Sequence, residues 1–115
     1  MHEMSIALDI LNIVEKTAQT NGATVVKDIY VDVGALAGVM IPSLEFGLEV
    51  AKRNTRARLA AIHIREIEGR GRCPTCGGTF PMGFYIEPCP LCEDSYLSMT
   101  SGNELRVREI EVEKN

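Results

Sequence analysis

The sequence predicts an α+β fold in which two helices lie on a three-stranded sheet and a zinc-ribbon module with two Cys-x-x-Cys turns is inserted before the last strand. Apolar residues recur with a helical period in two segments and alternate with polar residues in three others. The four cysteines form two Cys-x-x-Cys pairs separated by 12 residues. Glycine and proline concentrate around those cysteines, which marks the module as a separate part of the chain.

Length and composition bound the class of protein. A chain of 115 residues, 45% of them apolar and 24% charged, can form one globular domain or a small core with a metal-stabilised module. The formal net charge of −4 argues against a broad electrostatic surface for nucleic acid or anionic lipid. Charge-free runs such as Val33–Leu44 are far shorter than the ~20 apolar residues of a membrane span. No secretory signal is visible, so we expect a cytoplasmic protein.

The first predicted element is a helix from Met4 to about Gln19, because its apolar residues recur at helical spacing. Polar side chains form the opposite stripe, which makes the helix amphipathic. Asn21-Gly22 follows, and such a pair ends a helix with a left-handed cap. The predicted apolar face consists of Met4, Ala7, Leu8, Leu11, Val14 and Ala18.

A strand is predicted next, at about Thr24–Val33, where apolar and polar residues alternate. We expect Gly34–Gly38 to form a loop. Pro42 suits the first turn of a second helix, which reaches about Asn54. The apolar face of this second helix would combine Leu44, Leu48 and Ala51, with Phe46 and Val50 beside them.

Two further strands complete the predicted sheet. The first is expected at Leu59–Glu68, where alternate residues from Ala60 to Ile64 are apolar and share one face. The second follows the cysteine-rich insert. The parity of its apolar residues changes between Val107 and Ile110. That change predicts a β-bulge near Arg108-Glu109.

The four cysteines, Cys73, Cys76, Cys89 and Cys92, indicate a metal site. In a chain without an export signal, this spacing favours metal over disulfides. Two facing Cys-x-x-Cys turns can complete a tetrahedral set of four sulfur ligands, and four soft thiolates with no open position favour a structural Zn(II). The alternatives are a redox dithiol and thiols that share no function.

The segment around the cysteines has a composition of its own. Residues 69–103 hold four of the five prolines and six of the ten glycines. Such a segment buries little apolar surface, so we expect bound metal to supply much of its stability. We therefore predict a zinc-binding domain of residues 69–103 inserted into an α/β domain of residues 1–68 and 104–115. Two roles stay open for Phe80, Phe84 and Tyr85, which are packing around the ribbon and contact with a partner.

The rest of the sequence offers few groups for catalysis. Gly34–Gly38 lacks the Lys and the Ser or Thr that a P-loop needs. His63 lies between two isoleucines of a predicted strand, which places it on the solvent side. No Ser-His-Asp or Cys-His set can be assembled. We therefore expect no catalytic residues and no enzyme activity.

The N-terminus, Met1-His2-Glu3, offers a second metal site. The Met1 amine and the His2 amide nitrogen can close a five-membered chelate ring, and His2 Nδ1 can close a six-membered ring with the same amide nitrogen. The Glu3 amide nitrogen, the Glu3 carboxylate, water or a partner's ligand could fill a fourth position. Nitrogen donors in a square plane favour Ni(II) or Cu(II). The alternative is a frayed terminus with a solvated imidazole.

Taken together, these motifs resemble those of the HypA family of hydrogenase maturation factors, which are nickel metallochaperones. The resemblance covers essentially the whole chain. It rests on Met1-His2-Glu3, on Cys73-Pro-Thr-Cys76, on Cys89-Pro-Leu-Cys92 and on the closing strand Glu104–Val112. Val33–Gly38 also resembles the family's loop after its first strand.

The resemblance implies nickel at Met1, His2 and Glu3, and structural zinc at the four cysteines. It implies delivery of nickel to the large subunit of NiFe-hydrogenase, together with the maturation GTPase HypB as a partner. In some members of the family the same factor serves urease maturation, which this sequence does not decide.

Two other classes of function share single features with this chain. A zinc-ribbon module that binds nucleic acid would need basic residues beside the cysteines, yet residues 69–103 carry two Arg against two Glu and one Asp. A Cys-x-x-Cys oxidoreductase usually places one such motif at a strand–helix junction with one reactive thiol. Here both pairs lie in Gly- and Pro-rich turns, so we expect neither activity.

Overall fold

The computed structural model describes residues 2–114 and divides into two compact units. The first unit comprises Met1–Asp32, Val39–Arg65 and Arg106–Asn115. The second unit comprises Val33–Gly38 and Glu66–Leu105. Each unit has its own three-stranded sheet. In one the strand order is β2 (Ala61–Ile67), β1 (Val25–Gly34) and β6 (Leu105–Glu113), and in the other it is β4 (Thr79–Pro81), β3 (Arg70–Arg72) and β5 (Ser98–Ser101).

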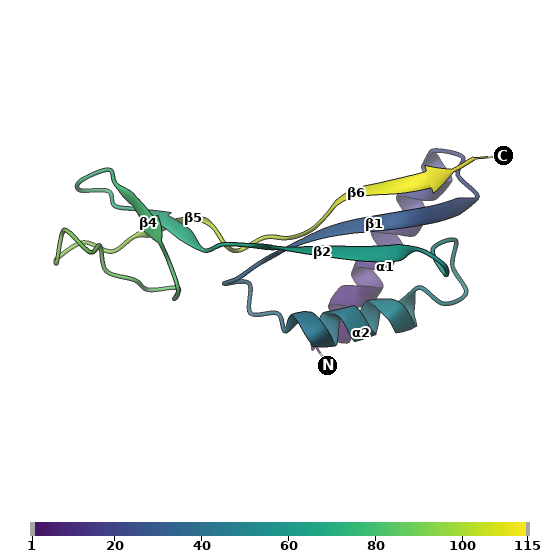
Figure 1. Cartoon of the computed structure of the whole chain (residues 1–115), viewed down its shortest axis with the longest axis horizontal. Helices are drawn as coiled ribbons and strands as arrows, with labels where there is room; N and C mark the ends of the chain where they lie inside the picture. The colour runs from purple at the N-terminus through teal and green to yellow at the C-terminus, as the bar shows by residue number, and fades with distance from the viewer. Residues whose placement is uncertain (1, 115) are drawn as a thin grey trace. The chain divides into compact units, whose positions relative to one another are not determined.

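The elements follow one another in the predicted order, with two helices, three long strands and an insert before the last strand (Figure 1). The α+β fold with an inserted cysteine-rich module is therefore confirmed. Among the described residues, neither helix is long and apolar enough to cross a membrane. The bounds are α1 His2–Thr20, β1 Val25–Gly34, α2 Ile41–Ala51, β2 Ala61–Ile67, β3 Arg70–Arg72, β4 Thr79–Pro81, β5 Ser98–Ser101 and β6 Leu105–Glu113.

Helix α1 ends where the sequence predicted. Gly22 has a positive φ of 69°, which a residue with a Cβ adopts only with strain. The Ala23 backbone N–H donates to the Ala18 carbonyl, and the Asn21 side chain donates to the Thr17 carbonyl. These bonds satisfy carbonyls of the last turn, as a left-handed cap should.

The core of the first unit lies between the two helices and β1. Gly47 of α2 faces Ala7 of α1 so closely that a Cβ on Gly47 would lie 3.2 Å from the Ala7 Cβ. The predicted apolar faces are partly wrong, because Leu8 is 49% exposed and Phe46 is 72% exposed. The buried helical positions are Ala7, Ile10, Leu11, Val14 and Ala18 of α1 and Leu44, Gly47 and Leu48 of α2.

Strand β1 carries a buried carboxylate that the alternating pattern assigned to the polar face. Asp32 is fully buried and accepts hydrogen bonds from the guanidinium groups of Arg65, Arg106 and Arg108. Burial by itself would raise the pKa of Asp32, but these hydrogen bonds outweigh it and hold the pKa below its ordinary value. The three arginines therefore lie over an ionised side chain.

Strand β6 shows the predicted change of parity. Val107 and Ile110 are both partly buried, and the two residues between them are exposed. The bulge near Arg108-Glu109 stays a prediction. His63 of β2 is exposed as expected, stacks on Tyr30 at 4.6 Å between ring centroids, and lies 2.8 Å from an Asp28 carboxylate oxygen.

The second unit has a small core. Strand β3 pairs antiparallel with β4 and with β5, and the register with β5 shifts between Arg70 and Gly71. Because cysteines supply part of so small a cluster, a metal ion bound by them would stabilise the unit. The buried residues are Leu36, Cys73, Met82, Cys89 and Leu97, with Phe80, Cys92 and Met99 packed against them.

Candidate metal centres

The four predicted zinc ligands come together in the second unit. The Sγ atoms of Cys73, Cys76, Cys89 and Cys92 all lie within 4.8 Å of one another, and those of Cys76 and Cys89 are 4.0 Å apart. A tetrahedral zinc ion with Zn–S bonds of about 2.3 Å needs sulfurs roughly 3.8 Å apart. The donor set and its spacing therefore fit Zn(II) without large rearrangement.

Each Cys-x-x-Cys turn aims backbone N–H groups at its first sulfur. The Cys76 N–H lies 3.5 Å from Cys73 Sγ, and the N–H groups of Leu91 and Cys92 each lie 3.4 Å from Cys89 Sγ. Such donors favour a thiolate over a thiol. The first turn closes through Gly77, whose φ is 75° and whose N–H donates to the Cys73 carbonyl at 2.8 Å.

A side-chain contact joins the two turns. The hydroxyl oxygens of Thr75, inside the first turn, and Ser95, just after the second, are 2.6 Å apart. The Ser95 backbone also bonds to the second turn at both ends, since its N–H donates to the Cys92 carbonyl and its carbonyl accepts from the Cys89 N–H. These contacts hold the two pairs of sulfurs face to face.

The local surroundings give the thiols of Cys73 and Cys92 different pKa values. The hydrogen bond from the Cys76 backbone lowers the pKa of Cys73 to about 6. Burial, followed by the neighbouring thiols of Cys76 and Cys73, raises the pKa of Cys92 to about 12. A bound metal cation favours the thiolate at each position. Metal binding therefore releases protons and weakens as the medium becomes acidic.

The predicted nickel ligands lie at the start of α1. Met1 is outside the described residues, and His2 and Glu3 form the first helical turn, so the expected helix start at Met4 was two residues late. The His2 side chain is 66% exposed and that of Glu3 is 11% exposed. His2 Nδ1 lies 3.7 Å from Glu3 Oε2.

A contact from the loop before α2 fixes the Glu3 side chain. The Met40 backbone N–H donates to Glu3 Oε2 at 3.2 Å, and this hydrogen bond holds the pKa of Glu3 below its ordinary value. An ionised carboxylate in the first turn of a helix also offsets the positive end of the helix dipole. Glu3 therefore stabilises the first turn of the helix, which also contains His2.

The first turn of a helix leaves backbone nitrogens without intrahelical partners. The amide nitrogens of His2 and Glu3 belong to this group, and the exposed His2 ring lies beside them. Such a site offers nitrogen ligands at the surface of the unit. The helix dipole disfavours a cation at this end, so it would weaken the binding of a metal ion there.

A comparison with protein families decides where the chain belongs. Residues 1–112 match the family model described as "Hydrogenase/urease nickel incorporation, metallochaperone, hypA". This chain belongs to the HypA family. Members of this family are metallochaperones and not enzymes, in agreement with the absence of a catalytic set in the sequence.

Curated relatives match over their full length. The hydrogenase maturation factor HypA of Parabacteroides distasonis is 40% identical over 114 residues, which cover 99% of each chain. The factors of the same name from Geobacter metallireducens and Chlorobaculum parvum are 41% and 42% identical over 113 residues, covering 98% of this chain and 100% of each relative. The resemblance to HypA inferred from the motifs is therefore confirmed.

Solved structures support the fold. The solution structure of the Ni metallochaperone HypA from Helicobacter pylori matches with a TM-score of 0.72 at 20% identity, covering 98% of both chains. A second solution structure, of a HypA protein, matches with a TM-score of 0.74 at 22% identity, covering 100% of this chain and 98% of that one. At these identities the likeness concerns the HypA fold alone.

Two contacts around the HypA motifs had not been expected from the sequence. Thr75 and Ser95 stand close to the cysteines, and their residue types were the one hint of a polar contact there. The bond from Met40 to Glu3 had no local signal, because 37 residues separate the two positions. Both contacts position the predicted ligands.

Proposed function

We propose that this chain is a nickel metallochaperone for the maturation of NiFe-hydrogenase. It binds Ni(II) at its N-terminus through Met1, His2 and Glu3, and it passes the ion to the hydrogenase large subunit with the GTPase HypB. Cys73, Cys76, Cys89 and Cys92 hold a structural Zn(II). Nickel delivery takes place in the cytoplasm. The family description also allows urease as a second recipient of the nickel.

One observation carries the nickel site. The exposed imidazole of His2 lies in the first turn of a helix, where backbone nitrogens lack intrahelical partners. This arrangement supports a ligand set of backbone and imidazole nitrogens, which suits Ni(II). Membership of a nickel metallochaperone family adds the identity of the cargo.

The surroundings of Glu3 bear on the fourth ligand. Its carboxylate is nearly buried and accepts the Met40 N–H, so coordination through that oxygen would break this hydrogen bond. Coordination through the Glu3 amide nitrogen breaks no such hydrogen bond and requires only the loss of the amide proton. We therefore favour the amide nitrogen of Glu3 over its carboxylate as the contribution of this residue.

The proposal divides the chain into a nickel-binding α/β domain of residues 1–68 and 104–115 and a zinc-binding domain of residues 69–103. The separation into two compact units supports this division, although the second unit also includes Val33–Gly38. Leu36 from that loop packs in the core that contains Cys73 and Cys89.

Nickel titration of untagged protein tests the proposal. Mass spectrometry first establishes that Met1 is present. His2→Ala should abolish stoichiometric nickel binding while zinc content and helix content stay unchanged. His63→Ala is the matched control, because it removes the other histidine, which is also exposed, and it should bind nickel normally. Normal nickel stoichiometry in His2→Ala would contradict the assigned ligands.

Blocking the amine gives an independent test. One glycine added before Met1 converts the amine into an amide and should weaken nickel binding as strongly as His2→Ala. A free terminal amine titrates near ~8, so nickel affinity of the unmodified chain should also fall as the pH falls below neutrality. Transfer is measured separately, by nickel uptake into an immature hydrogenase large subunit with HypB and GTP.

A further inference from the structure

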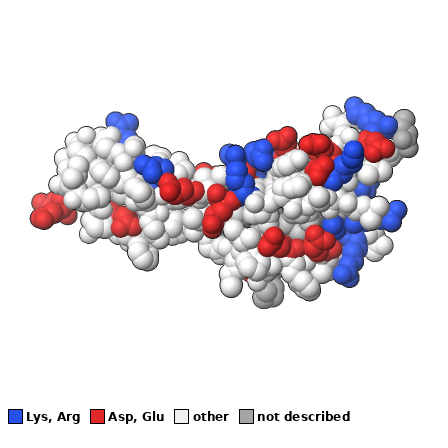
Figure 2. Space-filling model, in the orientation of Figure 1, with Lys and Arg blue, Asp and Glu red and all other residues white. Residues whose placement is uncertain are grey.

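The net negative charge of the chain resides in the second unit. Acidic and basic residues are equal in number in the first unit, so the formal charge of −4 belongs to the second. Figure 2 shows much of the second unit, in the region of β4 and β5, as uncharged surface. Its most exposed large apolar side chains are Phe84, Tyr85, Ile86, Leu91 and Tyr96, each more than 60% accessible. An acidic unit with exposed apolar groups suits a partner that is both apolar and basic.

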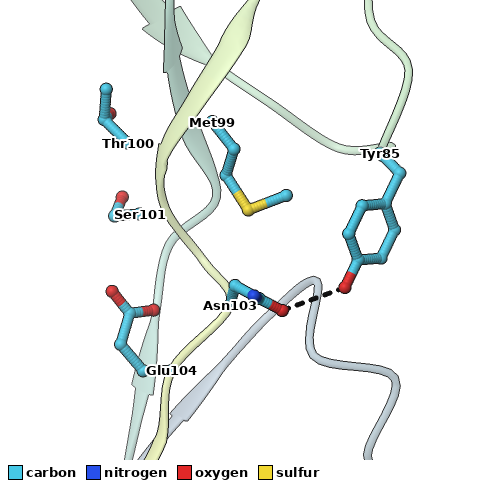
Figure 3. Close-up of a pocket in the computed structure, with 6 residues that line it drawn as sticks. All are labelled: Tyr85, Met99, Thr100, Ser101, Asn103 and Glu104. Carbon is cyan, nitrogen blue, oxygen red and sulfur yellow. Dashed lines mark hydrogen bonds between the residues drawn. The ribbon is translucent and has the colours of Figure 1, made fainter.

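A pocket of about 570 Å³ lies beside β5 in this unit (Figure 3). The hydroxyl of Tyr85 donates to the Asn103 side-chain oxygen at 2.9 Å, which holds the aromatic ring in place. The Met99 side chain lies on the same side of β5 as that ring, while Glu104 lies on the other side. The lining residues are Tyr85, Met99, Thr100, Ser101, Asn103 and Glu104.

The pocket follows strand β5. Met99, Thr100 and Ser101 are consecutive and all line it, although successive side chains of a strand point to opposite faces. Strand β5 ends the sheet order β4-β3-β5 among the described residues, so only one of its edges pairs with β3. The other edge can pair with an extended segment of another protein.

We propose that this edge binds an extended segment of a partner protein in which apolar and basic residues alternate. The segment lies along β5 and places an apolar side chain against Tyr85 and Met99. The next residue points to the opposite face, where a Lys or Arg meets Glu104. Glu104 is fixed for this role, because its Oε1 accepts the Gly102 N–H at 2.8 Å.

The probe is the peptide acetyl-Val-Arg-Val-Arg-Val-amide, added to the full-length, zinc-loaded, isotope-labelled chain and followed by amide chemical shifts. We expect shift changes concentrated at Tyr85 and Met99–Glu104. A peptide with glutamine in place of both arginines should bind about fivefold more weakly, as expected for loss of a partly exposed ion pair. No shift change at millimolar peptide would overturn the proposal.

Matched variants distinguish binding of the peptide in the pocket from general electrostatic attraction to the acidic second unit. Glu104→Gln keeps an oxygen that can accept the Gly102 N–H and should weaken the arginine peptide about fivefold. Glu93→Gln removes the same charge from an exposed residue that does not line the pocket, and it should have little effect. Equal weakening by the two variants would overturn the proposal.

Three further readouts complete the test. Tyr85→Ala should abolish peptide binding, whereas Tyr85→Phe keeps the ring and should retain most of it. Concentration-dependent shifts of β5 without peptide would mean that a second copy of this chain covers the edge, which would also overturn the proposal. Nickel titration of Glu104→Gln should be unchanged. Failure of this proposal can therefore be distinguished from failure of the proposed nickel site.

Discussion

The Met40 backbone N–H donates to the Glu3 carboxylate across 37 residues of sequence. This hydrogen bond ties the first turn of α1 to the residue that precedes α2. The carboxylate therefore already accepts a hydrogen bond that stabilises the first unit. The contact assigns Glu3 a positioning role at the N-terminus, beside the exposed ring of His2.

Substitution of Glu3 should weaken nickel binding by loosening the helix start. Glu3→Ala removes the acceptor of the Met40 N–H and should weaken nickel binding roughly 10-fold, as loss of a group that positions metal ligands does. Glu3→Gln keeps an acceptor oxygen and should cost less. Nickel titration compares both variants with Glu45→Ala, which removes an exposed carboxylate of α2. If Glu3→Gln were as damaging as Glu3→Ala, the carboxylate itself would be the ligand.

The acidity of Glu3 predicts a pH dependence. Its pKa in the folded state lies below the ordinary value of 4.5. Its contribution to stability is therefore present above that value and is lost as the pH falls through the lowered pKa. Unfolding of the first unit by urea, followed by circular dichroism of the helices, should show a smaller loss of stability in acid for Glu3→Gln than for the unmodified chain.

Asp32→Asn should destabilise the first unit by about 2 kcal/mol at neutral pH, because it removes charged hydrogen bonds from a fully buried group. The difference should shrink as the pH falls below 3.8, the ordinary value for this side chain, since protonation removes the same interaction. Urea unfolding at two pH values measures this. Asp9→Asn, an exposed position on α1, is the control and should change stability little.

Local sequence patterns predicted the elements but missed these long-range contacts. Helix and strand periods, the Asn21-Gly22 cap and Pro42 in the first turn of α2 depend on neighbours within a few residues, and the structure agrees with them. Asp32 and its arginines are 33 to 76 residues apart. Alternation in β1 therefore identified a polar face without revealing that three guanidinium groups would cover one carboxylate.

The cysteine site was easier to predict than the N-terminal site for a physical reason. Two Cys-x-x-Cys turns supply four sulfurs from short loops, so their spacing alone restricts the geometry, and the structure brings the sulfurs together. The proposed N-terminal chelate depends on whether the first residues are helical or frayed. The sequence left that open, and α1 begins at His2, where the Met40 N–H donates to the Glu3 carboxylate of its first turn.

Two glycines of the second unit should differ in how much stability is lost when each is replaced by alanine. A Cβ on Gly34 would lie 2.1 Å from the Gly102 carbonyl oxygen, a backbone atom that cannot rotate away. Gly38 has a positive φ of 73°, but a Cβ there would meet nothing within 4 Å. Gly38→Ala should therefore cost about 1–2 kcal/mol for its backbone conformation, and Gly34→Ala clearly more. Thermal unfolding of the zinc-loaded protein compares them, and equal costs would contradict the close packing.

Removal of zinc should unfold the second unit and leave the first folded. The core of the second unit includes Cys73 and Cys89, whereas the core of the first unit contains no cysteine among the described residues. Chelator treatment under reducing conditions should therefore expose residues 69–103 to protease while helix content is retained. Loss of the helices together with zinc would show that the two units unfold as one.

The two cysteines of the first turn should differ when replaced by serine. Each replacement lowers zinc occupancy, because serine is a poor ligand for a soft site. Cys73 is fully buried in the core of the second unit and accepts the Cys76 N–H, whereas Cys76 is exposed. Cys73→Ser therefore loses packing as well as a ligand and should lower both zinc content and the thermal midpoint more than Cys76→Ser. Metal analysis and thermal unfolding of the pair measure this, and full zinc content in either variant would contradict the four-sulfur site.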